Sequence, residues 1–407
     1  MSGKFEAPRG TQDVTPADWP AWAHVLRTGE ELFARYGYRR IQTPVFEDTE
    51  LFARTSGEGS DVVQKEMYTF TDRSDRSLTL RPEGTAPICR AYLQHGMQQL
   101  PQPVKLYAVA SMYRYAAPQR GRFREHWQFS VEAIGSEDPA IDAELIQLYD
   151  ELLRSLGIAD VTLLLNSIGD ENCRPQYLDA LSRWLDEHDA LLDDDAREKR
   201  RNSPLRVFDV KSERVRAALA DAPRIGDSLC APCREHFAAV TSLLDTYEVP
   251  YVLDPTLVRG LDYYTRTTFE FVPAAIGLAV GGGGRYDGLI EQLGGKPTPG
   301  IGFGAGIERI MLSLPEPPAA PALDVFLAVE PGAPRELALE WLQELRAAGI
   351  AADTDYAGRS LKGQLTQAGR SGAVTTVIVS AEGAILRRHG AQDEPLAHAD
   401  VLGRLKP

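Results

Sequence analysis

Apolar residues recur along the chain with two different periods, which predict where helices and strands lie. Over residues 17–36, apolar positions 22, 25, 26, 32 and 33 gather on one side of a helix that ends at Gly37. Residues 38–48 have the composition of a strand but contain Pro44, which belongs at a sheet edge or a bulge. Further strands are expected at 77–81, 104–110, 126–134, 265–272 and 299–304. Because hairpin-like loops separate most of them, the pattern predicts an antiparallel sheet.

Two changes in this pattern divide the chain into domains. Residues 171–250 are highly charged and helical in pattern, so we expect an inserted helical domain between two parts of one larger domain, 1–170 and 251–315. The proline-rich stretch SLPEPPAAPAL places a linker at 316–322. Residues 323–407 alternate strand and helix, which predicts a small α/β domain.

Two of the predicted strands alternate polar and apolar residues, so that their polar side chains share one face. In HWQFSVEAIG the polar residues are Gln128, Ser130 and Glu132. In LVRGLDYYTRTTFEF, positions 264, 266, 268 and 270 fall on one side, whereas a turn at Gly260 sets the direction of Arg259. A solvated sheet face explains either set alone. Two such faces together can line a polar pocket.

The stretch TLRPEGTAPICRAYL leads from a strand into a helix. Thr85 is a good N-cap for that helix, and capping alone would explain its presence. Glu83 stands at the strand end beside Gly84, where a carboxylate can face a cleft and bind an ammonium group.

The stretch PGIGFGAGIERIMLSL places glycines at alternate positions before a helix that carries Arg309. Gly302, Gly304 and Gly306 would leave one strand face free of side chains, so that a flat ring such as adenine can lie against the backbone. Close packing of the helix on the strand explains the glycines equally well. The sequence has no P-loop and no dinucleotide-binding glycine motif.

Composition and charge limit the functions that this chain can have. Its 407 residues are 43% hydrophobic, enough for a large core and more than one domain. It has no membrane-length apolar run and no signal-like start, so we expect a cytosolic protein. A net charge of −14 argues against indiscriminate binding to nucleic acid. One segment, MYRYAAPQRGRFREHWQ, nevertheless interleaves aromatic residues with Arg114, Arg120, Arg122 and Arg124.

The four cysteines are too few for a disulfide framework in a chain of this length, which agrees with a reducing compartment. Cys230 and Cys233 form a CxxC pair with His236 nearby, and Cys173 is a distant fourth candidate ligand. A single CxxC pair is a weak signal, because structural zinc sites need four ligands. We therefore assign no metal to the protein itself, and whether the pair binds zinc stays open.

Taken together, these segments resemble the class II aminoacyl-tRNA synthetases, and specifically the histidyl-tRNA synthetases, along the whole chain. FARYGYRRIQTPVFEDTELF, MYRYAAPQRGRFREHWQFSVEAIG and GIGFGAGIERIM resemble the three class II motifs, while TLRPEGTA and LVRGLDYYTRTTFEF resemble histidine-specific segments. The resemblance implies an α+β fold with an antiparallel catalytic sheet flanked by helices, an inserted helical domain and a C-terminal α/β anticodon-binding domain. It also implies a homodimer built on the first motif.

The resemblance further implies ATP-dependent attachment of L-histidine to tRNA(His) through a histidyl-adenylate, with ATP and Mg²⁺ required. Arg259 and Arg114 would be catalytic and bind the α-phosphate, which fits the need for fixed positive charge where two anions meet. The implied ATP ligands are Arg114, Arg122, Arg309 and Gly304. The implied histidine-binding residues are Glu83, Gly84 and Thr85 at the amino end, Gln128 and Arg259 at the carboxylate end, Glu132 at an imidazole N–H, and Arg114, Tyr263 and Tyr264.

Two segments depart from the family pattern. Ala116 and Ala117 replace a Glu-Arg pair whose glutamate usually contacts adenine and whose arginine usually helps to read the extra 5′ guanosine of the tRNA. Gln119 and Arg124 are the remaining candidates for acceptor-stem contacts. The C-terminal domain is short near SAEGAILRRHGAQDEP, so its anticodon contacts are not assigned.

Two other functions stay open at this point. A non-catalytic histidine-sensing paralogue, such as the regulatory subunit of ATP phosphoribosyltransferase, would share the catalytic fold. Such subunits usually lose the anticodon domain and the catalytic motifs, whereas RPEGTA and the Arg259 segment are both present here. A plain RNA-binding module would leave the carboxylates of the pocket without a purpose. The sequence favours the synthetase.

Overall fold

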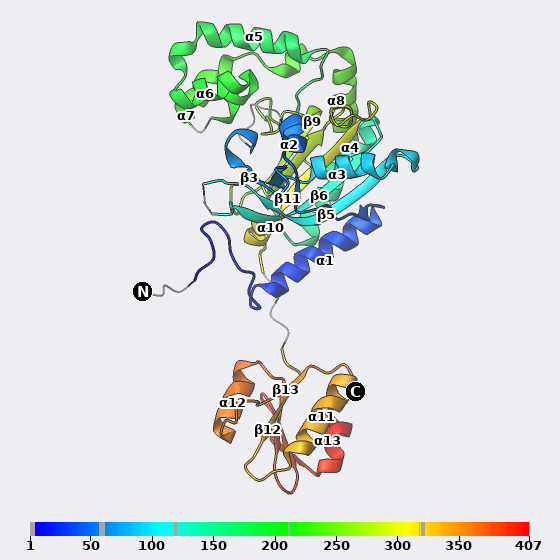
Figure 1. The fold of residues 1–407 in the computed structure, drawn as a ribbon, viewed down its shortest axis with the longest axis vertical. Coiled ribbons are helices and arrows are strands. Elements are labelled where there is room, and N and C mark those ends of the chain that lie inside the picture. The colour runs from blue at the N-terminus through cyan, green and yellow to red at the C-terminus, as the bar shows by residue number, and fades with distance from the viewer. Residues whose placement is uncertain are drawn as a thin grey trace. The chain divides into compact units, whose positions relative to one another are not determined.

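The computed structural model describes residues 5–56, 62–117, 120–210, 212–316, 318 and 322–406. The chain forms two compact units, Met1–Pro318 and Ala319–Pro407, shown in Figure 1. The larger unit is built on an eight-stranded sheet and the smaller unit on a five-stranded sheet. In the ranges just given, no helix has the length and apolar character needed to span a membrane.

The large sheet is antiparallel except at its two edges, where β1 runs parallel to β5 and β8 runs parallel to β7. The predicted antiparallel α+β fold is therefore confirmed. In spatial order its strands are β1 (Arg39–Arg40), β5 (Val104–Tyr113), β6 (Glu125–Ile134), β11 (Gly300–Gly306), β10 (Gly281–Arg285), β9 (Thr265–Pro273), β7 (Val161–Ser167) and β8 (Val252–Leu253).

The single strand predicted over residues 38–48 is wrong. The chain forms two short strands there: β1 joins the large sheet, and β2 (Phe46–Asp48) joins a separate sheet with β4 (Ser77–Leu80) and β3 (Tyr68–Thr71). Pro44 has no N–H to donate to a strand partner. Its carbonyl instead accepts a hydrogen bond from Arg81, 3.2 Å away. The proline therefore marks the point where the chain leaves one sheet for another.

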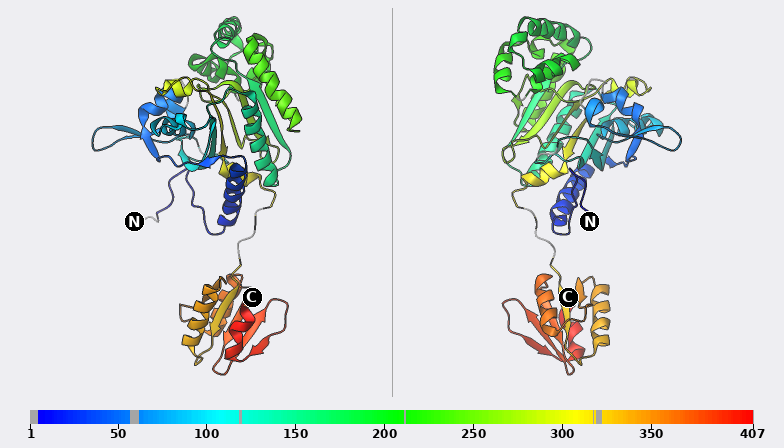
Figure 2. Two further views of the ribbon diagram at one scale, coloured as in Figure 1. Left: turned by 90° about the vertical axis from the view of Figure 1, so that its right-hand side faces the viewer. Right: turned by 60° about the vertical axis from the view of Figure 1, so that its left-hand side comes forward.

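Helices surround the large sheet, and α5, α6 and α7 of the predicted insertion (green in Figure 2) gather at one end of this unit, whereas its last helix, α8, packs beside α4. Residues 171–250 enclose an apolar cluster of their own, although Val240 and Leu244 of the last helix belong to the main core. The helices of the large unit are α1 (Trp19–Arg35), α2 (Thr49–Ser56), α3 (Thr85–Gln94), α4 (Pro139–Ser155), α5 (Arg174–Glu187), α6 (Asp194–Asn202), α7 (Glu213–Ala218), α8 (Ala231–Thr246), α9 (Leu289–Gln292) and α10 (Ile307–Ser313).

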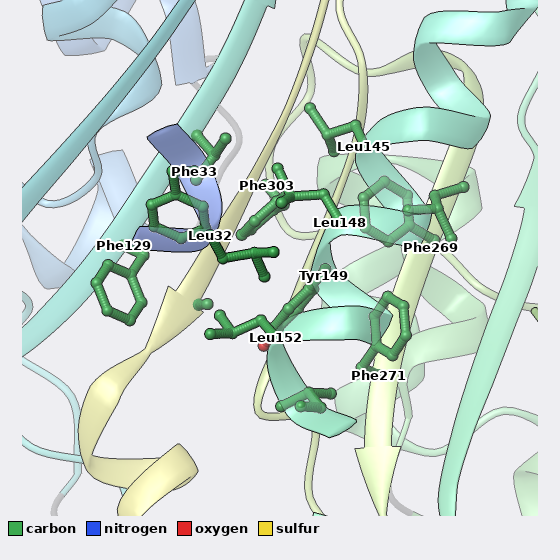
Figure 3. Packing of buried hydrophobic residues seen from close by; sticks show 14 of the residues in the cluster. Leu32, Phe33, Phe129, Leu145, Leu148, Tyr149, Leu152, Phe269, Phe271 and Phe303 are labelled. Atoms are coloured by element: carbon green, nitrogen blue, oxygen red, sulfur yellow. The ribbon is translucent and has the colours of Figure 1, made fainter. Parts of the chain in front are cut away.

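One face of the large sheet is packed mainly with apolar side chains (Figure 3), although Arg285 of β10 and Asp142 of α4 form a buried ion pair. Phe129 and Phe303 point from adjacent strands toward Phe33 of α1 and Tyr149 of α4. The Tyr149 and Phe303 rings stack with centroids 4.6 Å apart, and Phe33 meets Phe129 edge to face at 5.2 Å. Because side chains alternate along a strand, the residues between these aromatics must point to the opposite face.

The smaller unit has the predicted alternation of strands and helices. Val325 and Leu327 pack against α11, whereas Phe326 and Ala328 pack against α12, so the two helices cover opposite faces of its sheet (Figure 2). The predicted linker at 316–322 falls largely outside the described residues. In spatial order the strands are β13 (Ala352–Thr354), β12 (Val325–Val329), β14 (Thr375–Val379), β15 (Ala384–Arg388) and β16 (Glu394–Leu396), and the helices are α11 (Arg335–Ala347), α12 (Leu361–Arg370) and α13 (Val401–Leu405).

A substitution at Gly283, in the glycine-rich strand β10, can test how closely strands β10 and β11 approach each other. A Cβ atom at Gly283 would lie 1.9 Å from the carbonyl oxygen of Gly302, and backbone cannot move aside as a side chain can. We expect Gly283→Ala to lower the free energy of unfolding by about 2–4 kcal/mol in urea denaturation. Gly226→Ala, where nothing lies within 4 Å, is the control. Equal stability of the two variants would contradict this packing.

Candidate active site

The face of the large sheet opposite the aromatic core carries a cavity of about 310 Å³, a size typical of small-molecule sites. Strands β6, β9, β10 and β11 form its floor, and the segments before and after them form its walls. Most of the predicted site residues meet here. Those that line the cavity are Glu83, Thr85, Arg114, Arg122, Gln128, Arg259, Tyr263, Tyr264, Gly304 and Arg309.

Two of the lining arginines are positioned by backbone carbonyl groups. Arg114 donates from Nε to the Pro82 oxygen at 2.7 Å. Arg309 donates from Nε to Gly121 at 2.8 Å and from Nη1 to Ala279 at 2.6 Å. A carbonyl group orients a guanidinium without neutralising its charge. These two side chains therefore keep a full positive charge at the cavity wall.

The other two lining arginines are paired with carboxylates. Arg122 donates from Nη2 to Glu66 at 2.8 Å, and Arg259 is ion-paired with Glu270. Gly282 makes the second pair possible, since a Cβ there would lie 2.8 Å from Nη1 of Arg259. All four arginines are partly exposed, so each can reach a ligand in the cavity.

The positive charges at this wall contribute to the pKa of His126, which also lines the cavity. Its pKa falls to about 3, mainly because of burial and also because Arg114, Arg309 and Arg122 repel a second positive charge. The imidazole of His126 is therefore neutral at pH 7. The same repulsion, added to burial, lowers the pKa of Arg309. The electrostatics of this wall thus favour an anion.

The helix cap at the start of α3 differs from the prediction. Thr85 is the first residue of the helix, and the carboxylate of Glu83 accepts hydrogen bonds from the backbone N–H groups of Thr85 at 2.6 Å and Ala86 at 2.9 Å. Glu83 therefore caps the helix itself. Burial raises its pKa, and the Tyr263 hydroxyl lies 3.5 Å from its Oε2. Glu83 still lines the cavity, where an ammonium group can reach it.

Glu132 lies beneath the cavity floor and is fully buried, so it does not form part of the wall. Its two carboxylate oxygens accept hydrogen bonds from the hydroxyl groups of Thr85 at 2.7 Å and Tyr286 at 2.6 Å. Gly302 leaves the space that this carboxylate occupies, because a Cβ at Gly302 would lie 1.7 Å from Oε2. Removal from water raises the pKa of Glu132 to about 8 despite the two donors.

Two of the alternate glycines of β11 make room for polar side chains of β6, which neither predicted explanation of these glycines included. Gly302 accommodates Glu132, and Gly304 accommodates Gln128, whose Nε2 would lie 2.7 Å from a Cβ there. Gly304 and Gly306 also line the cavity, as a floor for a flat ring requires. The Gln128 amide donates to Ser130 at 2.9 Å, so the predicted polar face of β6 lies toward the cavity.

Two other predicted site residues, Gly84 and Arg124, are not among the residues that line the cavity. Gly84 is packed against Ser130, since a Cβ would lie 2.1 Å from Oγ. Arg124 stacks its guanidinium 3.9 Å from the centroid of the Tyr115 ring. Gln119 lies outside the described residues. The predicted contacts of Arg124 and Gln119 with tRNA stay predictions.

Three residues of the site had no role in the sequence prediction. Glu270 is ion-paired with Arg259, and Tyr286 donates a hydrogen bond to Glu132. His126 lines the wall that carries the arginines. Tyr286 follows the run of four glycines in GGGGRYDGL, and that unusual run was the available signal. Glu270 belongs to the polar face predicted for its strand. His126 shares the parity of Gln128, Ser130 and Glu132 in β6, so the same rule places it on the polar face of that strand.

The predicted metal-ligand candidates separate into two places. His236 is bonded through Nε2 to Asp142 at 2.9 Å. Cys173, by contrast, lies with Cys230 and Cys233, and Asp170 takes the fourth position, with the polar atoms of the four side chains all within 4.8 Å of one another. The distant cysteine is therefore part of the group, and the neighbouring histidine is not.

Comparisons with known proteins agree with this geometry. The family model described as histidyl-tRNA synthetase matches residues 10–310. That match spans well over half of the chain. The chain belongs to the histidyl-tRNA synthetase family. Its sequence is 48% identical over 384 residues to a histidine–tRNA ligase of Dehalococcoides mccartyi, covering 93% of this chain and 92% of the relative.

Other members of the histidyl-tRNA synthetase family give the same result. A histidine–tRNA ligase of Moorella thermoacetica is 48% identical over 382 residues, covering 92% of this chain and 90% of that relative. The crystal structure of apo histidyl-tRNA synthetase from S. aureus superposes with a TM-score of 0.82 at 36% identity, covering 99% of this chain and 100% of that one. The two-unit fold is thus shared along the full length of a solved family member.

Glu132 makes stability depend on pH in a way that one substitution can isolate. Its pKa is about 8 in the folded protein against 4.5 for an ordinary glutamate, so the stability it contributes is complete below about pH 4.5 and is lost as the pH rises through 8. We expect the free energy of unfolding of the unsubstituted protein to fall with rising pH more steeply than that of Glu132→Gln, by up to about 1.4 kcal/mol per pH unit.

Thermal and urea denaturation between about pH 5 and pH 9 measures this difference. Glu187→Gln is the matched control, because Glu187 is exposed on α5 and should leave the pH dependence unchanged. Parallel stability curves for the unsubstituted protein and Glu132→Gln would show that Glu132 has an ordinary pKa.

Proposed function

We propose that this chain activates L-histidine with ATP to form histidyl-adenylate and then transfers the histidyl group to tRNA(His). One observation carries the proposal: Arg114 and Arg259 line the same cavity as Glu83, Thr85 and the paired tyrosines. The relatives named histidine–tRNA ligase, at 48% identity, support the same reaction. Histidine and ATP would therefore share one site.

The arginines would accelerate the first step by electrostatic stabilisation. When the histidine carboxylate attacks the α-phosphate, two anions approach each other, and negative charge builds up on the phosphate oxygens as pyrophosphate leaves. Arg114 and Arg259 would bind those oxygens, while Arg122 and Arg309 would hold the β- and γ-phosphates. Because their orientation is already fixed by carbonyls and carboxylates, little reorganisation is needed during the reaction.

Mg²⁺ bound to the phosphates would add positive charge at the leaving group. The cavity offers a carboxylate oxygen donor of the kind that Mg²⁺ binds, from Glu270, which is ion-paired with Arg259. Binding of nucleotide would therefore give Glu270 a second cation to contact.

Recognition of histidine would use the hydroxyl and carboxylate groups at the opposite wall. The Thr85 hydroxyl donates its proton to Glu132 at 2.7 Å, so its oxygen is left as an acceptor toward the cavity, where the α-ammonium group would bind with Glu83. Tyr263 and Tyr264 would enclose the imidazole, and Gln128 would bind the carboxylate end. Glu132 supports this wall from below, so a contact with the imidazole N–H requires an opening between Thr85 and Tyr286.

The adenine of ATP and the tRNA would bind next to the histidine-binding wall. Adenine would lie on the floor that Gly304 and Gly306 leave free of side chains. The acceptor end of tRNA(His) would approach past Arg124 and Gln119, and the α/β unit at 323–407 would bind the anticodon. The catalytic unit comprises 1–170 and 251–315, with 171–250 inserted.

A histidine-sensing subunit is the second function to weigh. A solved structure titled ATP phosphoribosyltransferase regulatory subunit/histidyl-tRNA synthetase, from Bacillus halodurans, resembles this chain with a TM-score of 0.66 at 24% identity, which bears on the fold alone. A sensor needs no phosphate-binding arginines. Four of them at one cavity therefore favour the enzyme.

Arg259 tests the proposed activity directly. We expect Arg259→Gln to lower the rate of histidine-dependent ATP–pyrophosphate exchange by about 100- to 1,000-fold, since an interaction made in the transition state is lost. Arg216→Gln is the control, because Arg216 is exposed on α7, away from the cavity lining. Binding of histidine by the unsubstituted protein without any exchange would instead identify a sensor.

The proposed homodimer is supported by an exposed apolar face on the three-stranded sheet. Val45, Phe46 and Phe70 are 41%, 49% and 42% exposed, and the two phenylalanine rings meet edge to face at 6.1 Å. Val45 and Phe46 belong to the segment that resembles the first class II motif. An apolar cluster of this kind is typical of an interface.

We expect the protein to have twice the mass of one chain in size-exclusion chromatography with light scattering. Phe46→Glu should raise the dissociation constant of the dimer at least about tenfold, because a buried charge would replace an aromatic contact. Leu191→Glu, at an exposed apolar position in the inserted segment, is the control. A monomeric unsubstituted protein, or a dimer that Phe46→Glu leaves unchanged, would contradict this interface.

A further inference from the structure

A cluster of three cysteines and one aspartate lies where the chain enters and leaves the inserted segment. Asp170 follows strand β7, and Cys173 immediately precedes helix α5. Cys230 immediately precedes helix α8, and Cys233 lies in its first turn. The two halves of the cluster are thus far apart in sequence and close together in space. Neither the proposed reaction nor the cavity uses any of these four side chains.

Three of the distances within the cluster match the edges of a tetrahedral metal site, and all of them are at most 4.8 Å. Cys173 Sγ lies 3.9 Å from Cys233 Sγ and 3.5 Å from Asp170 Oδ1, and Cys230 Sγ lies 3.7 Å from the same oxygen. Four ligands around zinc, with Zn–S of about 2.3 Å and Zn–O of about 2.1 Å, give S–S edges of about 3.8 Å and S–O edges of about 3.6 Å. A disulfide would bring two sulfurs to about 2.05 Å.

The surroundings of the cluster support negatively charged ligands. The backbone N–H of Asp170 points at Cys173 Sγ from 3.4 Å, and the backbone N–H of Asn172 donates to Asp170 Oδ1 at 3.0 Å. Hydrogen bonds of this kind orient metal ligands. Two helices, α5 and α8, begin at the cluster, so the positive ends of their dipoles face it. Arg266 adds a positive charge 3.6 Å from the second oxygen of Asp170.

The backbone leaves room for the cluster at one glycine. Gly169 has φ of +64°, and a Cβ there would lie 2.6 Å from Cys173 Sγ. A side chain would therefore both strain the backbone and displace the sulfur. Asp170, Cys173 and Cys233 are buried and Cys230 is partly exposed, so the site is accessible to an ion from one side only.

We propose that Asp170, Cys173, Cys230 and Cys233 bind one zinc ion and so fasten both ends of the inserted segment to the large sheet. Sulfur-rich tetrahedral sets select zinc over calcium or magnesium, which prefer oxygen ligands. The four protein ligands leave no open position, and the site is structural and not catalytic. No bond to substrate and no redox step is involved.

A short chain of contacts connects the proposed zinc site to Tyr264, which lines the cavity. Arg174, the first residue of α5, donates from Nη2 to the Tyr264 carbonyl at 2.6 Å. The Arg266 N–H donates to the Gly169 carbonyl at 2.7 Å. Loss of the ion would therefore loosen the backbone that carries Tyr264, in addition to the start of the insertion.

The test is the metal content of the purified full-length chain, measured by inductively coupled plasma mass spectrometry. We expect about one zinc per chain, and a fall to less than about one tenth in Cys173→Ser and in Cys233→Ser. Cys89→Ala is the matched control, because Cys89 is the remaining cysteine, is buried elsewhere and should leave the zinc content unchanged. His236→Asn should also keep its zinc, since His236 binds Asp142.

A second measurement uses the unsubstituted protein, so that its result does not depend on whether the cysteine variants fold. After the thiolates are titrated with a mercurial, the released zinc should be captured by a chromogenic chelator in a one-to-one ratio with the chain, and the melting temperature should fall. Reconstitution with cobalt should give the absorption of tetrahedral thiolate coordination. Protein without bound metal, or a Cys173–Cys233 disulfide in an unreduced peptide digest, would overturn the proposal.

Discussion

The structure depends above all on holding four guanidinium groups around one cavity, two of them without a carboxylate partner at salt-bridge distance. Like charges that line one cavity repel each other, and this repulsion adds to burial in lowering the pKa of His126. The protein offsets the repulsion mainly with directed hydrogen bonds: Arg114 and Arg309 rest on carbonyl oxygens, and only Arg122 and Arg259 have carboxylate partners. A polyphosphate would replace repulsion by attraction. The proposed affinity for ATP would therefore not require new charges to be brought into the site.

The sheet supports this arrangement by giving its two faces opposite characters. One face is closed by aromatic rings such as Phe303 packed on Tyr149, and the other carries Gln128 and the glycines between β9 and β6. Glycine removes side chains where carboxylates and guanidinium groups must approach the backbone. The same close approach makes these strands intolerant of added atoms. Stability and function thus place the same demand on the central strands.

Much of this could be predicted from the sequence, because period-two alternation determines which side chains share a face. That rule placed Gln128 on the cavity side of its strand, and motif resemblance brought Arg114 and Arg259 together. The rule fails where tertiary contacts override local preference. Strand β10 was not predicted because four glycines have low strand propensity. Pairing across distant segments, such as Glu132 with Tyr286, has no local signal in a single sequence.

The central claim is that both predicted catalytic arginines act on one phosphate next to the amino acid. The most direct measurement is a crystal structure of the protein with a non-hydrolysable sulfamoyl analogue of histidyl-adenylate. The account predicts that Arg114 and Arg259 both contact the sulfamoyl group, with the ammonium group at Glu83 and Thr85 and the imidazole beside Tyr264. An analogue bound so that the two arginines contact different parts of it, or bound outside this cavity, would contradict the account.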